Sequence, residues 1–158
     1  MFDRLLPRSV DNTYSGRKLA LWLLALVTAV RIIQSVLIIF NGYSTVQRAD
    51  GIPLDTYPPD AAQTVVSLFA LYALVRLILS LLCVLVLVRY RGAVPFMLAV
   101  LLLNYLAVQL ILQFVPLVRV GTPPGSIVNR AVMALTAIGL VLSLWKRGDH
   151  RGAGVTQN

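Results

Sequence analysis

Two arginines lie inside long apolar runs of this sequence, and they are the residues best suited to chemistry. Arg31 interrupts the first run, and Arg76 lies near the middle of the second run, from Ala61 to Val88. Arginine keeps its charge in proteins, so a guanidinium placed there needs a partner, water, or a route out of the hydrocarbon. Guanidinium forks suit phosphate and carboxylate groups, which makes an anion the first partner to consider.

A constant spacing places other polar residues near these arginines. Thirteen residues separate a basic residue at the edge of a run from a polar residue inside it in three places: Lys18 to Arg31, Arg89 to Arg76, and Arg91 to Asn104. At 1.5 Å per residue, all three lie at one depth, about 20 Å into a membrane. We predict a polar layer there that binds a ligand or anion. Its residues are Arg31, Gln34, Tyr72, Arg76, Asn104 and Gln109.

The polar residues of each run also recur at helical spacing, so each helix has one polar face. Tyr72, Arg76 and Ser80 share a face, and Tyr105, Gln109 and Gln113 form another row. Two interpretations follow. In one, these groups satisfy each other as interhelical hydrogen bonds, with the arginines paired to carbonyls, Tyr72, Gln34, Asn104 and water. In the other, Arg31 and Arg76 share an anion.

The elements that position this layer are four membrane spans. The chain has 158 residues, 58% of them hydrophobic, and runs of about 20 apolar residues cross a bilayer. The spans are expected at about 19–41, 61–88, 93–118 and 126–145, with an outer loop at 42–60. We therefore predict an all-α membrane protein, an antiparallel four-transmembrane-helix bundle. The domain limits are a cytoplasmic N-terminal segment (1–18), the membrane domain (19–145) and a cytoplasmic basic tail (146–158).

The connections between the spans carry their own predictions. The turn at 89–92 is short, so spans two and three should be antiparallel neighbours, with Pro95 in the first turn of the third. Asp60 and Ser126 are suitable N-caps for spans two and four. Glycine and prolines in the loop 42–60 discourage a helix. We expect this loop to fold back over the outer mouth of the bundle without reaching Arg76.

The basic residues set the orientation. Nine Lys and Arg residues flank the side that holds both termini and the 89–92 turn, whereas the other two connections hold only Arg48 and Arg119. Because cytoplasmic loops are enriched in Lys and Arg, we predict a multi-pass protein with both termini cytoplasmic. The net charge of +8 is then explained by topology and by contact with anionic lipid headgroups, rather than by nucleic acid.

Composition excludes several classes of site. Cys83 is the only cysteine and His150 the only histidine, which rules out zinc, haem and iron–sulfur sites. The chain has no glutamate, and the carboxylates nearest the polar layer lie in the loop 42–60. Paired carboxylates, a nucleophile with its base, and a catalytic metal are all lacking, so we predict no enzyme and no cofactor.

Three stretches of the sequence carry a family resemblance: Asp50-Gly-Ile-Pro-Leu-Asp-Thr-Tyr, Thr64-Val-Val-Ser-Leu-Phe-Ala-Leu and Gly121-Thr-Pro-Pro-Gly. With these the chain resembles a group of small four-span bacterial inner-membrane proteins over most of its length. The resemblance implies a bacterial source and this architecture, and no particular activity. Small multidrug transporters are similar only in size, because their proton-coupled chemistry uses an intramembrane glutamate.

Two functions remain from the sequence. The favoured one is a non-catalytic accessory or scaffold subunit that packs into a larger membrane complex or a homo-oligomer, as suits a small chain with short connections. The alternative is a binder or carrier of an anionic lipid or amphipathic small molecule, held by the intramembrane pair Arg31 and Arg76.

Overall fold

The computed structural model of the chain describes residues 18–145, and most of them belong to four long helices. These are α2 (Lys18–Phe40), α4 (Pro59–Arg89), α5 (Val94–Phe114) and α6 (Pro124–Leu144). Each is long and apolar enough to cross a membrane, and no strand occurs among residues 18–145. The predicted all-α four-helix membrane bundle is therefore confirmed. The segment before Lys18 and the tail 146–158 lie outside the described residues.

Two short helices occupy the loop that was expected to lack them. Helix α3 (Gly42–Arg48) follows α2 directly, and the 3₁₀ helix η1 (Leu54–Thr56) precedes α4. The expectation was wrong for α3 because the prolines and Gly51 all lie after it. Val46 at its centre is completely buried in a small core that α3 forms with α4, so packing stabilises a segment of weak helical propensity.

The ends of the long helices differ from the prediction by a few residues. Helix α4 begins at Pro59, whose fixed φ suits the first helical position, and Pro58 takes the N-cap position predicted for Asp60. Helix α5 has Pro95 in its first turn, as predicted, but ends at Phe114 rather than near residue 118. Val115 precedes Pro116, and a residue before proline avoids the helical conformation.

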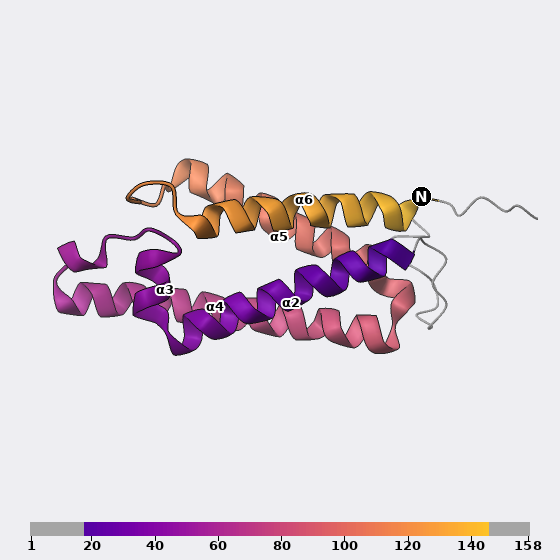
Figure 1. Cartoon of the computed structure of the whole chain (residues 1–158), viewed down its shortest axis with the longest axis horizontal. Coiled ribbons are helices and arrows are strands. Elements are labelled where there is room, and N and C mark those ends of the chain that lie inside the picture. Colours follow the sequence, from indigo (N-terminus) through magenta and orange to yellow (C-terminus); the bar gives the residue numbers. More distant parts are fainter. Residues whose placement is uncertain (1–17, 146–158) are drawn as a thin grey trace, which may run out of the picture.

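Helix α6 also begins earlier than predicted, at Pro124, with Pro123 as its N-cap. Ser126 therefore lies inside the first turn, and its hydroxyl donates to the Pro123 carbonyl at 2.8 Å instead of capping the helix. The α4–α5 connection includes the 3₁₀ helix η2 (Arg91–Ala93). Figure 1 places both ends of the described chain beside this connection. We call that end of the bundle the turn end and the opposite one the loop end.

Helix α2 is central to the packing. It lies along α4 and also crosses α6, while α5 packs mainly against α6. Helices α4 and α5 are antiparallel, but they diverge from their short connection, and α5 runs behind α6 (Figure 1). The prediction that they are neighbours thus holds only near the turn. This divergence separates α4 from α5 toward the loop end.

The turn end of the bundle is well packed. One apolar core joins residues from all four long helices, and it includes Leu24, Cys83, Leu98 and Val132. Cys83 is buried there as a small apolar side chain, as predicted. Gly139 lies against Leu98 and Leu23, which shows how a small residue lets α6 approach its neighbours closely. The open part of the fold is therefore confined to the loop end.

At the loop end, the two long connections are joined to each other. The Gly51 carbonyl accepts a hydrogen bond from the Val120 amide at 2.8 Å, and the Ala49 carbonyl accepts one from the Gly125 amide at 2.9 Å. Gly51 has a φ of 72°, a backbone conformation that residues other than glycine rarely adopt. The loop 42–58 thus folds back over the bundle, as expected. We call these two backbone hydrogen bonds the loop junction.

Candidate functional site

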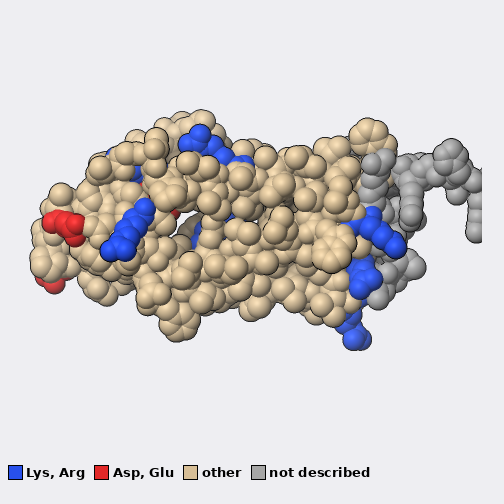
Figure 2. All heavy atoms as spheres, viewed as in Figure 1, with Lys and Arg blue, Asp and Glu red and all other residues tan. Residues whose placement is uncertain are grey.

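A cavity of about 500 Å³ lies at the loop end, between the diverging helices. All four long helices, the loop after α3 and the α5–α6 connection contribute to its lining. On α4 and α5, Leu68, Tyr72 and Ile111 line the cavity and are also exposed, so the cavity opens to the surface between these helices. Figure 2 shows a further hollow between α2 and α6, with basic side-chain atoms inside it. The cavity is therefore reachable from the sides of the bundle.

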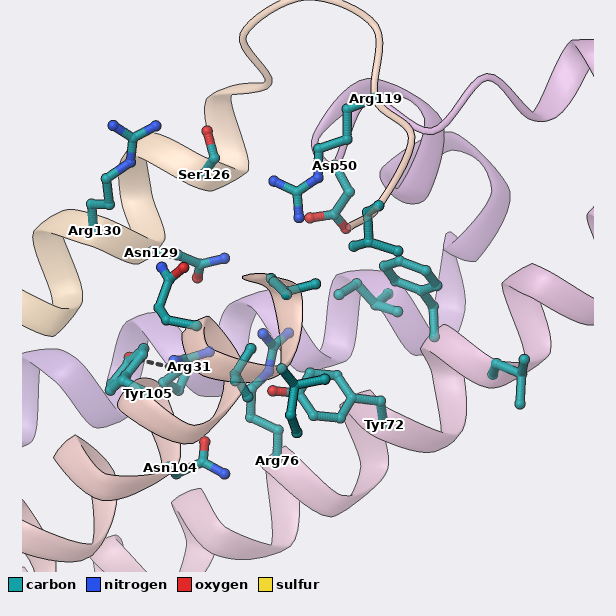
Figure 3. Close-up of a pocket in the computed structure, with 18 residues that line it drawn as sticks. Arg31, Asp50, Tyr72, Arg76, Asn104, Tyr105, Arg119, Ser126, Asn129 and Arg130 are labelled. Carbon is teal, nitrogen blue, oxygen red and sulfur yellow. Dashed lines mark hydrogen bonds between the residues drawn. The ribbon is translucent and has the colours of Figure 1, made fainter. Parts of the chain in front are cut away.

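Arg31 is buried beneath this cavity on α2. Only 6% of its surface is exposed. Its Nε donates a hydrogen bond to the Tyr105 hydroxyl, and its guanidinium carbon lies 4.1 Å from the centre of the Tyr105 ring (Figure 3). This contact combines a hydrogen bond with a cation–π interaction. Its two terminal nitrogens, Nη1 and Nη2, form no hydrogen bond within residues 18–145 and remain available to the cavity.

Arg76 enters the same cavity from α4. Its Nε donates to the Ser35 hydroxyl at 3.2 Å, and its guanidinium carbon lies 5.8 Å from the centre of the Tyr72 ring. Ser35 is completely buried, so this bond fixes the position of the Arg76 side chain against α2. The Nη2 atom of Arg76 is buried without a hydrogen-bond partner. Arg31 is close enough for the two like charges to repel.

Five of the six residues predicted for the polar layer line this one cavity. They are Arg31, Tyr72, Arg76, Asn104 and Gln109. Gln34 does not line it: this side chain is half-buried, and its Oε1 has no hydrogen-bond partner. The residues predicted from spacing on α2, α4 and α5 thus meet at one cavity, except for Gln34, which lies outside its lining.

The structure adds lining residues that the predicted layer lacked. They are Asp50, Tyr105, Arg119, Ser126, Asn129 and Arg130, together with apolar side chains. Tyr105 had a signal in the sequence, because it shares a helical row with Gln109. Arg119 had none, since it lies in an irregular connection. Arg130 is exposed and points away from the cavity in Figure 3.

Asp50 is the carboxylate that reaches the cavity. Asp50 belongs to the loop 42–60, in which the nearest carboxylates were expected, whereas Asp55 and Asp60 do not line the cavity. Asp55 accepts hydrogen bonds from Tyr43 and Gln47, and Asp60 is exposed in the first turn of α4. The loop junction instead turns Asp50 inward, where it lies beside Arg119 in Figure 3.

Opposing effects act on the Asp50 carboxyl, and none of them is a direct bond to an arginine. Burial raises the pKa of this carboxyl, and attraction from Arg119 and then Arg76 opposes that rise. Among the described residues it forms no hydrogen bond with either guanidinium. A Cβ atom built on Gly125 would lie 3.3 Å from Asp50 Oδ1, so the carboxylate borders the first turn of α6. The helix dipole favours negative charge there.

The arrangement places guanidinium groups, which suit anions, next to apolar side chains. Within residues 18–145, no three His, Cys, Asp or Glu side chains come together as metal ligands would. The cavity instead offers guanidinium donors at its base and apolar walls that include Leu68, Val108 and Leu112. Comparison with family models, with curated proteins and with solved structures found no match to this chain.

Proposed function

We propose that this chain is a non-catalytic integral membrane protein that binds an anionic amphiphile, a lipid or similar molecule, inside its bundle. The observation that carries the proposal is the cavity with Arg31 and Arg76 at its base between apolar walls. Ligand pockets in proteins have volumes of about 300–1,000 Å³, and this one falls within that range. An anionic head group and the first part of an apolar chain would occupy both kinds of surface.

The charges support an anion as the occupant. Two like charges at one depth of a membrane are costly, and the internal hydrogen bonds of Arg31 and Arg76 use only their Nε atoms. An anion between the guanidiniums would offset the repulsion and accept hydrogen bonds from the remaining nitrogens. Tyr105 and Ser35 hold the two side chains in place for this purpose, so the internal contacts position the site rather than saturate it.

The openings support the membrane as the source of the ligand. Leu68, Tyr72 and Ile111 are exposed at the opening between α4 and α5, on the apolar faces that would meet lipid. A ligand could therefore place its head in the cavity and leave its chain among the surrounding lipids. A carrier role would use the same site with exchange of the bound molecule.

The first test is retention of lipid by charge variants of Arg76. In native mass spectrometry from mild detergent, the parent chain is expected to retain an anionic lipid. The Arg76→Gln variant should retain at least about tenfold less of this lipid. Arg76→Lys should retain part, because lysine keeps the charge without the fork. Arg48→Gln, which removes an exposed guanidinium of α3, is the matched control and should match the parent. Equal retention by Arg76→Gln would contradict the proposal.

The accessory-subunit role predicted from the sequence stays a prediction. The same preparation addresses it, since a subunit of a larger complex would purify with a stoichiometric protein partner. A single species that retains lipid and no partner would favour the binding function over the accessory one.

We also place the chain in a bacterial inner membrane with both termini cytoplasmic. The bias of basic residues supports this orientation, as does the position of the start of α2 and the end of α6 at one end of the bundle (Figure 1). A reporter fused after Asn158 and one inserted between the exposed residues Asp55 and Thr56 should therefore report opposite sides. A cytoplasmic signal from the loop insertion would contradict the proposed orientation.

A further inference from the structure

We infer that the ligand's head group is dianionic, a phosphate monoester rather than a phosphodiester or a carboxylate. This rests on the proposed function and specifies the ligand class of that site.

The lining charges do not balance. The cavity is lined by four arginines and by Asp50. Arg130 is exposed and points outward in Figure 3, so solvent or headgroups can screen its charge. Arg31, Arg76 and Arg119 remain, and Asp50 compensates one of them. The cavity alone therefore carries two uncompensated positive charges.

Asp50 acts as a counter-ion that belongs to the protein. Its charge attracts Arg119 and Arg76, yet neither of its oxygens accepts a hydrogen bond from either guanidinium among residues 18–145. The terminal nitrogens of both guanidiniums can therefore donate to another acceptor. The carboxylate also lies beside the first turn of α6, where the helix dipole favours its negative charge.

A phosphate monoester matches this remaining charge. It carries about −1.5 to −2 charges at neutral pH and presents three acceptor oxygens. A phosphodiester and a carboxylate carry one negative charge each and would leave one guanidinium uncompensated. In a low-dielectric site, an uncompensated charge is costly, so a dianionic head should bind more tightly than a monoanionic one.

The experiment compares head groups on identical acyl chains. The purified chain in detergent is titrated with a diacylglycerol phosphate, a diacyl phosphodiester with a glycerol head, a diacylglycerol hemisuccinate as the carboxylate, and a zwitterionic lipid as background. The phosphate monoester is expected to bind at least about tenfold more tightly than the phosphodiester or the carboxylate. Inorganic phosphate forms a separate arm, and it should compete only weakly because it lacks the apolar chain.

Two variants connect the preference to the charge balance. Arg119→Gln leaves one uncompensated positive charge, so the preference for the monoester should fall toward equality with the phosphodiester. Asp50→Asn leaves three, so affinity for every anionic lipid should rise. Arg119 is half-buried in a connection and Asp50 in a loop, outside the tightly packed core at the turn end.

The outcomes separate this inference from the proposed function. Equal affinity of the parent for all three anionic lipids, together with loss of binding in Arg76→Gln, would overturn the dianion and leave the proposed function standing. No binding of any anionic lipid would overturn both. Competition by inorganic phosphate as strong as by the lipid phosphate would identify a free anion as the ligand. Weaker anion binding by Asp50→Asn would contradict its role as a counter-ion.

Discussion

Replacing Arg31 and Arg76 together with glutamine is expected to abolish binding of the anionic amphiphile and to leave the ligand-free bundle at least as stable. Each guanidinium at the centre of a membrane helix costs about 2.5–3.5 kcal/mol in insertion, and the two also repel each other. Glutamine can still bond with Ser35 or Tyr105 while removing both charges. Hydrogen bonds to charged groups contribute about 1.5–3 kcal/mol each, so affinity should fall on the order of 100-fold or more.

The measurement is a double-mutant cycle. Affinity for one anionic lipid and the ligand-free thermal midpoint are measured for the parent, both single variants and the double variant. Because both arginines hold one anion, the losses of affinity should not add. The control pair Arg48→Gln and Arg89→Gln removes the same net charge from exposed positions outside the cavity lining and should change neither quantity substantially. A double variant that melts well below the parent and binds lipid unchanged would assign both arginines a purely structural role.

The architecture was predictable because membrane helices depend on composition and length. Four apolar runs were enough to identify four helices, and the ends that differed lie at prolines, where Pro59, Pro116 and Pro124 decide the boundary. Helix α3 was not predictable in this way. It depends on the burial of Val46 against α4, a tertiary contact that no local pattern encodes.

The membrane depth of the candidate site was predictable from the sequence, but the hydrogen-bond partners of its residues were not. Equal spacing from the membrane edge placed Arg31, Arg76 and Asn104 at one level, and all three line the cavity. The partner of Arg31 is Tyr105 rather than its neighbour Asn104, because the rotation of α5 decides which side chain faces α2. That rotation follows from the packing of α5 on α6. The sequence pattern identifies the polar face of α5 but not which residue on that face contacts Arg31.

The inward position of Asp50 could not be predicted from the sequence. Three aspartates lie in the loop 42–60, and nothing local distinguishes Asp50 from Asp55 or Asp60. Its inward position depends on backbone hydrogen bonds between Ala49 or Gly51 and a connection far away in the sequence. Such contacts between irregular segments have no periodicity. The one acid near the arginines was therefore not predictable from the sequence.

Substituting Gly125 by alanine is expected to break the loop junction and weaken ligand binding together. A Cβ atom at this position would lie 2.6 Å from the Ala49 carbonyl oxygen, which is a backbone atom and cannot rotate away. The helical preference of alanine over glycine is worth up to about 1 kcal/mol, whereas overpacking costs about 1–3 kcal/mol. The hydrogen bond from the Gly125 amide to Ala49 should be lost as well, and movement of the loop should disturb the Gly51–Val120 bond next to Arg119.

Gly121→Ala is the matched control, because it changes the same connection without touching the loop 42–58. Gly121 has a φ of 69°, so alanine there is strained, but its Cβ would meet no atom within 4 Å. This variant should lower the thermal midpoint through backbone strain and retain the affinity for the anionic lipid. Gly125→Ala should lower both, because the hydrogen bond from Val120 to Gly51 in the junction holds the connection that carries Arg119 at the cavity. If both variants are less stable but bind the lipid as tightly as the parent does, the loop junction supports the fold without shaping the site.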